Sequence, residues 1–263
     1  MTDFQDTIWQ YYNREGRHDL PWRQAPFDPY RIMVSELMLQ QTQVSRVIPK
    51  HQAFLARFPS VADLAAADLG DVLREWSGLG YNRRAKFLHQ AARTIMHDFG
   101  GEFPATTSEL VRLAGIGANT AGAIQAYAFN QPVVFIETNI RSVYLHHFFA
   151  DQSDIPDSAI LEHVAQTVPA DKAREWYWAL MDYGSWLKQQ ITNPNRRSKH
   201  YARQSKFEGS RRQIRGQILR LLADQQLTRE DIAVRISDVR AMHVLDDLLA
   251  EGLVRQLGRR FSL

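Results

Sequence analysis

Cysteine is absent from the 263 residues of this chain. Disulfide bonds, thiol catalysis, cysteine-ligated zinc and ordinary iron–sulfur ligation are therefore excluded. The chain also lacks an apolar run near the ~18 residues of a membrane-spanning helix, and no basic-then-apolar leader opens it. Its 44% hydrophobic and 23% charged residues are typical of a soluble globular protein. We therefore expect a cytoplasmic, nucleoid-associated protein without membrane contact.

The net charge is only +3, but basic residues are concentrated in one segment. Between Pro194 and Arg220 stand nine lysines and arginines and a single acid, Glu208. Such a run indicates contact with nucleic-acid phosphates. A solvated surface or linker has the same composition, so the residues alone leave both interpretations open.

Strand signals are few, and helical periodicity dominates the chain. Glycine pairs follow three of the periodic segments, at 78 and 80, 100 and 101, and 115 and 117. We predict an all-α fold of short helices with tight connections. The predicted helices run near 3–12, 30–39, 44–58, 61–66, 69–76, 83–98, 107–113, 118–128, 138–148, 157–168 and 173–187.

The last part of the chain, residues 207–263, has a different pattern. An amphipathic helix, a second helix with Thr228 as its N-cap, and a third helix over Asp238–Glu251 follow one another. Alternating residues about a Gly258 turn then predict a hairpin. Three helices and a basic hairpin are typical of a winged-helix-like domain, although a plain helical appendix would share the apolar pattern. Its predicted DNA contacts are Arg211, Arg212, Arg259 and Arg260; the alternative is a module for packing or protein interaction.

One carboxylate stands inside an apolar helical run. Residues 31–43 read Arg-Ile-Met-Val-Ser-Glu-Leu-Met-Leu-Gln-Gln-Thr-Gln, so that Glu36 is followed by the polar stretch Gln40–Gln43. Burial penalises the charged form of an acid, and Glu36 can therefore donate a proton near neutral pH. Glutamines at a helix end can enter a duplex and fill the gap left by a displaced base. This pairing indicates chemistry on a nucleobase.

A glycine-rich turn, Gly115-Ile-Gly117, joins two predicted helices. Its glycines let backbone N–H groups approach a phosphate at the N-terminus of the next helix, where Asn119 and Thr120 follow. A lone Gly-x-Gly is usually only a turn, but the flanking helices make this a candidate helix–hairpin–helix.

A second carboxylate, Glu137, begins a helix after the apolar segment 133–136. An acid at this position can stabilise the positive end of the helix dipole, by about 0.3–1 kcal/mol. It can also place a fixed negative charge beside a developing cation. With Glu36 in the same chain, we favour the second interpretation.

Five segments together resemble the helix–hairpin–helix DNA glycosylase superfamily, and within it the adenine DNA glycosylases of the MutY type. They are Leu-Pro-Trp-Arg at 20–23, Ser-Glu-Leu-Met-Leu-Gln-Gln-Thr-Gln-Val at 35–44, Gly-Leu-Gly-Tyr at 78–81, the hairpin, and Met-Asp-Tyr-Gly at 181–184. The resemblance implies a six-helix domain at 29–132, a discontinuous helical domain at 1–28 and 133–206, and double-stranded DNA bound across the cleft.

The resemblance assigns Glu36 the protonation of the departing adenine. It makes Gln41, preceded by Gln40, the wedge that enters the base stack, and Thr42 and Tyr81 contacts of the opposite base. Tyr81 could instead be a packed aromatic residue.

The resemblance also places three side chains in the pocket of the extruded base, namely Arg23, Leu39 and Asp182. Asn139 stands where the family keeps an asparagine near the sugar. The alternatives are a core position for Leu39 and a surface acid for Asp182.

This chain departs from the family pattern in three ways. The second acid is usually aspartate, and the extra methylene of Glu137 requires an adjusted backbone, a slower enzyme or another substrate. Four cysteines usually hold an iron–sulfur cluster near 187–203, so this chain resembles the clusterless minority, in which basic residues take over phosphate contact. The tail is too short and too helical for the domain that checks for 8-oxoguanine opposite the adenine.

Asn119 stands where strand-cutting relatives use a lysine nucleophile, and an amide cannot form a Schiff base. We therefore predict a monomeric, monofunctional glycosylase of base excision repair that hydrolyses the N-glycosidic bond of a flipped purine, foremost adenine in a mispair. It needs no cofactor and no catalytic metal, although hairpin carbonyls could hold a structural monovalent ion. The alternatives are a same-fold glycosylase for another mispaired, deaminated or modified base, and a non-catalytic damage-binding protein.

Overall fold

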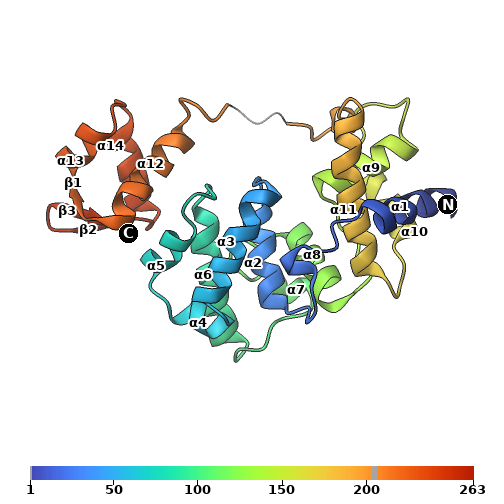
Figure 1. The fold of residues 1–263 in the computed structure, drawn as a ribbon, viewed down its shortest axis with the longest axis horizontal. Helices are drawn as coiled ribbons and strands as arrows, with labels where there is room; N and C mark the ends of the chain where they lie inside the picture. Colours follow the sequence, from blue (N-terminus) through green and yellow to red (C-terminus); the bar gives the residue numbers. More distant parts are fainter. Residues whose placement is uncertain (1, 203–205) are drawn as a thin grey trace. The chain divides into compact units, whose positions relative to one another are not determined.

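The computed structural model describes residues 2–202 and 206–263. It is mostly helical, which confirms the expected class, and it divides into two compact units (Figure 1). Unit 1 comprises Met1–Ile32, Ala105–Arg112 and Ile116–Arg203, and unit 2 comprises Met33–Pro104, Leu113–Gly115 and Gln204–Leu263. Among the described residues, no helix combines the length and apolar character needed to cross a membrane.

Unit 1 is built on the close packing of α9 (Thr138–Phe148) against α11 (Ala173–Gln190). A Cβ atom added at Gly184 would lie 2.3 Å from the carbonyl oxygen of Asn139, so only glycine fits here. The other elements of unit 1 are α1 (Thr2–Glu15), η1 (Pro21–Arg23), the start of α2 (Pro29–Leu39), α7 (Thr107–Leu110), α8 (Ala118–Phe129), α10 (Asp157–Thr167) and η2 (Pro194–Arg197).

Unit 2 is centred on α6 (Arg83–Asp98), whose apolar stripe of Ala85, Leu88, Ala92 and Ile95 is fully buried. Against α6 pack the helices α4 and α5. The elements of unit 2 are the rest of α2, then α3 (Val44–Arg57), α4 (Val61–Ala66), α5 (Leu69–Glu75), α6 (Arg83–Asp98), α12 (Arg211–Asp224), β1 (Leu227–Thr228), α13 (Arg229–Arg235), α14 (Ala241–Ala250), β2 (Arg255–Leu257) and β3 (Arg260–Ser262).

The boundaries of the units differ from those expected for the domains. Residues 116–132, expected with the six-helix domain, group with unit 1 because α8 packs against α11. Arg174 of α11 donates from Nε to the carbonyl oxygen of Tyr127 at 2.5 Å, and Arg174 Nη2 reaches the carbonyl oxygen of Ala128 at 2.9 Å. Residues 207–263 group with the helices of unit 2 instead of standing apart.

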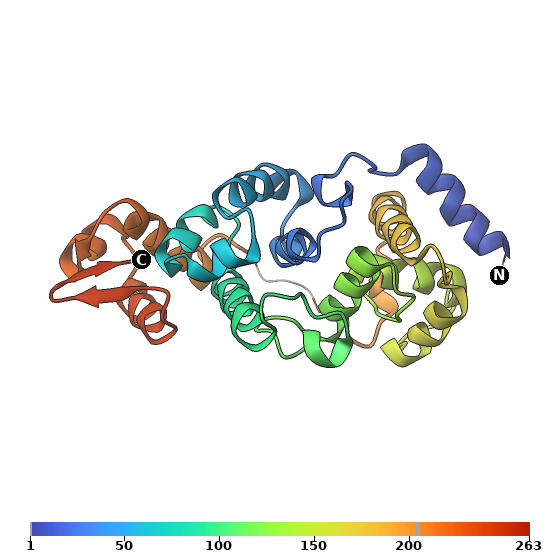
Figure 2. The ribbon, with the colours of Figure 1, turned by 90° about the horizontal axis from the view of Figure 1, so that it is seen from below.

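The C-terminal module, residues 206–263, contains three helices and a small antiparallel sheet, as expected for a winged-helix-like arrangement. Strand β3 lies between β1 and β2. The hairpin of β2 and β3, drawn as two arrows near the C-terminus in Figure 2, contains Gly258 between its strands, with a φ of +63°. The Thr228 side chain accepts a hydrogen bond from the backbone N–H of Asp231, so the predicted N-cap is confirmed. The additional strand β1 was not expected.

Ion pairs fasten this module to the helices of unit 2. Glu251, which follows α14, accepts hydrogen bonds from Arg215 at 2.9 Å and from Arg83 of α6 at 2.7 Å. Burial alone would raise the pKa of Glu251, but the two guanidinium groups lower it to about 2. Arg255 pairs with both oxygens of Asp68, at 2.5 and 2.6 Å. The module is therefore a fixed part of unit 2.

A buried arginine joins two loops of unit 2. Arg84 is 7% exposed, and burial lowers its pKa to about 10, so it remains charged at neutral pH. Its guanidinium donates to the carbonyl oxygens of Leu37 at 2.6 Å, Met38 at 2.9 Å, Gln40 at 2.6 Å, Leu79 at 3.3 Å and Gly80 at 3.0 Å. A cation here satisfies the last carbonyls of α2 and complements the helix dipole.

Replacing Arg84 by methionine keeps the stem but removes every donor of this junction. We expect Arg84→Met to lower the free energy of unfolding by about 2–4 kcal/mol, because buried carbonyls lose their partners. Arg93→Met, on the exposed side of the same helix, should change it by less than about 0.5 kcal/mol. Urea unfolding followed by circular dichroism measures both, and equal midpoints for the two variants would contradict the role given to Arg84.

Candidate active site and nucleic-acid interface

Glu36 lies at the edge of the core of unit 2. On the same helix, Met33, Val34, Leu37 and Met38 have no exposed surface, whereas Glu36 is half-buried. Glu36 is therefore a partly exposed acid on a helix whose apolar residues are buried. A proton donor must reach its substrate, and the exposed part of this side chain allows such contact.

Two loops next to Glu36 hold residues in the left-handed region. Gln41 follows the end of α2 with a φ of +56°, and Tyr81 follows Gly80 with a φ of +48°. For residues other than glycine this conformation costs roughly 1–2 kcal/mol, and it is concentrated at functional sites. Both positions are predicted DNA contacts. Thr42 lies between the loops, donating from Oγ1 to the carbonyl oxygen of Leu79 at 3.4 Å.

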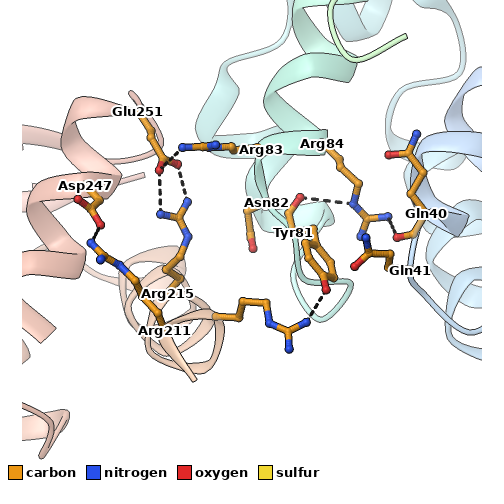
Figure 3. A pocket seen from close by; sticks show the side chains of 11 residues that line it. Gln40, Gln41, Tyr81, Asn82, Arg83, Arg84, Arg211, Arg215, Asp247 and Glu251 are labelled. Atoms are coloured by element: carbon orange, nitrogen blue, oxygen red, sulfur yellow. Dashed lines mark hydrogen bonds and ion pairs between the residues drawn. The ribbon is translucent and has the colours of Figure 1, made fainter. Parts of the chain in front are cut away.

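Gln40, Gln41 and Tyr81 are brought together at one cavity of unit 2, of about 650 Å³. Figure 3 shows these side chains with Arg84 on one side of the cavity, and Arg211 and Arg215 of α12 on the other. The structure thus gathers the predicted wedge, the predicted opposite-base contact and part of the predicted basic tail in one place.

The glycines of the hairpin are exposed. Gly115 has a φ of +79°, and a Cβ atom there would lie 2.7 Å from Cβ of Phe87, so the position requires glycine. Gly117 is the N-cap of α8 and has no side chain that could cap the helix. The backbone N–H groups of the first turn of α8 are therefore suited to binding an anion. Asn119 is exposed and Thr120 half-buried on the first turn of this helix.

Glu137 occupies the N-cap position of α9 in unit 1, but its side chain makes no capping hydrogen bond. The interpretation of Glu137 as a helix cap therefore lacks the hydrogen bond that a capping side chain makes to the backbone. The residue retains some exposed surface, yet the surrounding protein desolvates it, and this burial raises the pKa of Glu137 to about 7. An acid held in this way can change its charge near neutral pH.

Asp182 is not a surface acid. It is 3% exposed and accepts hydrogen bonds from Arg23 at 2.7 and 2.9 Å and from Nε of Arg17 at 2.7 Å. Burial raises its pKa, but the two arginines outweigh burial and hold the pKa below its usual value. Asp182 thus connects η1 to α11. If Asp182 also contacts the extruded base, its carboxylate oxygens must accept hydrogen bonds from the base in addition to those from Arg17 and Arg23.

The two remaining residues of the predicted base pocket lie in different units. Leu39 is half-buried at the end of α2 in unit 2, so it is not sealed in the core. Asn139 is half-buried on the first turn of α9 in unit 1, two residues after Glu137.

Side-chain hydrogen bonds order the cysteine-free segment that follows α11. Asn195, 4% exposed, donates from Nδ2 to Oγ of Ser142 at 2.5 Å and to the carbonyl oxygen of Thr138 at 3.2 Å. Because 187–203 contains no cysteine, it cannot hold an iron–sulfur cluster by thiolates. Within residues 2–202 and 206–263, no group of three histidine, aspartate or glutamate side chains is arranged to hold a metal ion.

The predicted basic contacts of the C-terminal module fall into two sets. Arg259 and Arg260 are exposed at the hairpin turn, as expected for phosphate contacts. Arg211 forms an ion pair with Asp247, and Arg212 donates to the hydroxyl group of Tyr81. In the basic run from Pro194 to Arg220, residues 203–205 lie outside the described residues.

The sequence interpretation missed Arg84 and the docking residues Arg83 and Glu251. A signal for Arg84 exists, because it begins the apolar stripe of α6 and is followed at helical spacing by Leu88 and Ile95. A charged residue on a buried helix face must find polar partners inside the protein.

Comparison with known proteins identifies the family. The description "HhH-GPD superfamily base excision DNA repair protein" matches residues 34–169. An adenine DNA glycosylase of Mycolicibacterium smegmatis is 35% identical over 94% of this chain and 92% of its own length. One of Buchnera aphidicola subsp. Baizongia pistaciae is also 35% identical, over 70% of this chain, which spans about half (52%) of that relative.

Solved structures give the same result for the fold. A thermostable thymine-DNA glycosylase superposes with a TM-score of 0.61 at 25% identity, over 70% of this chain and 85% of that one. The matched family and the relative aligned along nearly its whole length cover the segment that carries Glu36, both loops and the hairpin. The chain therefore belongs to the HhH-GPD superfamily of base excision DNA repair proteins.

Proposed function

We propose that this chain is a DNA glycosylase that removes adenine from mispaired double-stranded DNA. One observation carries the proposal: Glu36 is a half-buried acid on an otherwise apolar, buried stretch of the helix that ends in the left-handed loop of Gln41. The proton donor and the wedge that replaces the displaced base are therefore consecutive parts of one element. The adenine DNA glycosylases aligned along most of the chain support adenine as the base.

The reaction is hydrolysis of one bond. Flipping the base costs a few kcal/mol, and a mismatch lowers that cost. Glu36 protonates N7 of the adenine, and the C1′–N9 bond breaks with its electron pair moving to the base. The sugar is left as an oxocarbenium ion, which the Glu137 carboxylate stabilises. Water then adds its oxygen to C1′ and releases a proton, giving an abasic site.

Because protein side chains supply all of this chemistry, we propose that the reaction needs no cofactor and no catalytic metal. We also propose that the chain acts as a monomer. A structural monovalent ion on the hairpin carbonyls would not take part in bond cleavage. The exposed hairpin glycines and the N-terminus of α8 bind a DNA phosphate.

A second candidate is removal of another base by the same mechanism. Glu137 in place of the usual aspartate shifts the negative charge by one methylene, and the thymine-DNA glycosylase among the similar structures has another substrate by its name. A panel of duplexes with different mispaired and deaminated bases separates the candidates by the base released. Release of none in a single-turnover assay would favour a damage-binding protein.

Converting Glu36 to glutamine keeps the size of the side chain and removes the proton donor. We expect Glu36→Gln to slow excision by at least ~10²-fold, while the affinity for the duplex is retained. Glu102→Gln, an exposed acid of the same unit, is the matched control and should excise at the wild-type rate. Single-turnover excision and fluorescence anisotropy give the two quantities, and full turnover by Glu36→Gln would reject the assignment.

The raised pKa of Glu137 predicts a pH dependence. Glu36 must keep its proton for the reaction, so its ionisation at higher pH lowers the single-turnover rate. Only the ionised carboxylate of Glu137 stabilises the sugar cation, so Glu137 should give the pH profile of this rate an ascending limb with a midpoint near pH 7. Glu137→Gln should be slow and should lose this limb. A limb that persists in the variant would assign the titration to another group.

Strand cleavage should be absent. Asn119 offers an amide on the first turn of α8 where an amine nucleophile would be needed. We expect product strands to break only after alkali treatment, in a gel assay of end-labelled duplex. Nicks without alkali, accompanied by a borohydride-trapped protein–DNA adduct, would show that another amine attacks the sugar.

A further inference from the structure

A second cavity of unit 2, of about 690 Å³, is lined by residues of α3, α5 and α12 and is called here the α3–α12 cavity. Both α3 and α12 pack against α5, and three buried leucines, Leu73, Leu79 and Leu219, line its apolar part. Gln41 and Tyr81 line both this cavity and the one described above. The α3–α12 cavity therefore begins at the predicted wedge and extends between two helices.

Positive charge lines the α3–α12 cavity without a compensating carboxylate. Arg46 of α3 and Arg220 of α12 line it, and no acid stands among the described residues of its lining. Lys50, one turn after Arg46, lies next to it: Cε of Lys50 is 3.9 Å from the position that a Cβ atom of Gly78 would take. The surroundings of this cavity therefore attract a ligand with several negative charges.

The two lining arginines keep their charge available to such a ligand. Arg46 and Arg220 are both exposed, and Nε of Arg220 donates to the carbonyl oxygen of Gly216, on its own helix, at 3.2 Å. Within residues 2–202 and 206–263, neither guanidinium forms an ion pair with a carboxylate. The hydrogen bond to Gly216 places the Arg220 side chain along α12, at the opening of the cavity.

Gly216 keeps the α12 side of the cavity open. It lies in the middle of α12, one turn from both Arg212 and Arg220, and all three residues line the cavity. Glycine weakens the interior of a helix relative to alanine, so its presence calls for a packing or functional reason. Packing gives none, because a Cβ atom added at Gly216 would have no neighbouring atom within 4 Å. The missing side chain instead lets a ligand approach the helix closely.

We propose that the α3–α12 cavity binds the sugar–phosphate backbone of the complementary strand, the one opposite the excised nucleotide; this inference rests on the proposed function. Thr42 and Tyr81, the predicted contacts of the opposite base, line the cavity where it begins. From Arg212 to Arg220 is a distance of about 12 Å along α12, at about 1.5 Å per residue. At about 3.4 Å per nucleotide of one strand, the cavity follows roughly three to four nucleotides.

A phosphodiester backbone fits the chemistry of this lining. It carries one negative charge per nucleotide, and Arg46, Lys50 and Arg220 offer cations at separate points of the cavity. The absence of a side chain at Gly216 gives a sugar and its phosphate room between these cations. The C-terminal module and α3 thereby hold the intact strand together, beyond the position of the opposite base.

The test measures affinity for duplexes that are uncharged at chosen linkages. Each duplex carries a tetrahydrofuran abasic analogue opposite guanine, so that no base can be released. Methylphosphonates replace the phosphates up to about four nucleotides to either side, in the complementary strand or in the strand with the analogue. Full-length wild-type protein is compared with the double variant Arg46→Met, Arg220→Met and with Arg235→Met, which removes an exposed cation elsewhere in the C-terminal module.

Neutral linkages in the complementary strand should weaken wild-type binding by about tenfold, measured by fluorescence anisotropy. The double variant should lose less than about threefold, because it already lacks these contacts. Its slope of log affinity against log salt should be shallower by about two, at about 0.9 per phosphate contact, whereas Arg235→Met keeps the wild-type slope. An equal loss in wild type and double variant, no loss in wild type, or an unchanged slope in the double variant overturns the inference.

A second variant tests the open side of the cavity without removing a charge. Gly216→Leu should weaken duplex binding by about tenfold while the thermal midpoint stays the same or rises, because leucine favours the helix. Ala233→Leu adds a similar side chain at an exposed position of α13 and should bind like wild type. Wild-type affinity in folded Gly216→Leu contradicts the inference. Because no duplex here has an excisable base, failure of adenine excision appears separately, in the excision assay.

Discussion

The buried guanidinium of Arg84 is the interaction on which the proposed site depends. Its donors reach the carbonyl oxygens that end the Glu36 helix and those of the turn before Tyr81. A charged group that is 7% exposed, and whose partners are carbonyl dipoles, is stable only while several dipoles point at it. The segments that carry Glu36, Gln41 and Tyr81 are therefore held by the same guanidinium. A shift of either loop would remove hydrogen bonds from Arg84.

The second constraint is the fixed attachment of the C-terminal module. Pairs such as Arg255 with Asp68 are half-exposed and contribute little individually, but Glu251 joins two arginines from different parts of the chain. This attachment brings α12 to the cavity at Gln41 and Tyr81. A module that resembles a separate winged helix in sequence thus becomes one wall of the proposed DNA interface.

Hydrogen bonds order the cysteine-free segment that follows α11 in unit 1. Asn195 hydrogen-bonds the first turn of α9, the helix that Glu137 begins, and Ser198 forms a bridge with Ile155. Amide and backbone hydrogen bonds order this segment. Asp182, bound by Arg17 and Arg23, connects the N-terminal segment to α11 in a similar way.

The sequence by itself determined most helices, because glycine pairs and local capping signals act over a few residues; α4, α6 and α9 begin and end as predicted. It also identified the family and predicted roles for Glu36 and the hairpin, because these are contiguous patterns. Only the tertiary structure decided that Arg84 is a buried junction, that Asp182 is paired inside unit 1, and that Arg212 meets Tyr81. Arg84 reaches Gln40 across 44 residues of the chain, Arg212 reaches Tyr81 across 131, and Asp182 reaches Arg17 across 165. Such contacts depend on which helix faces pack together, and hydrophobic periodicity leaves the partner of a buried charge undefined.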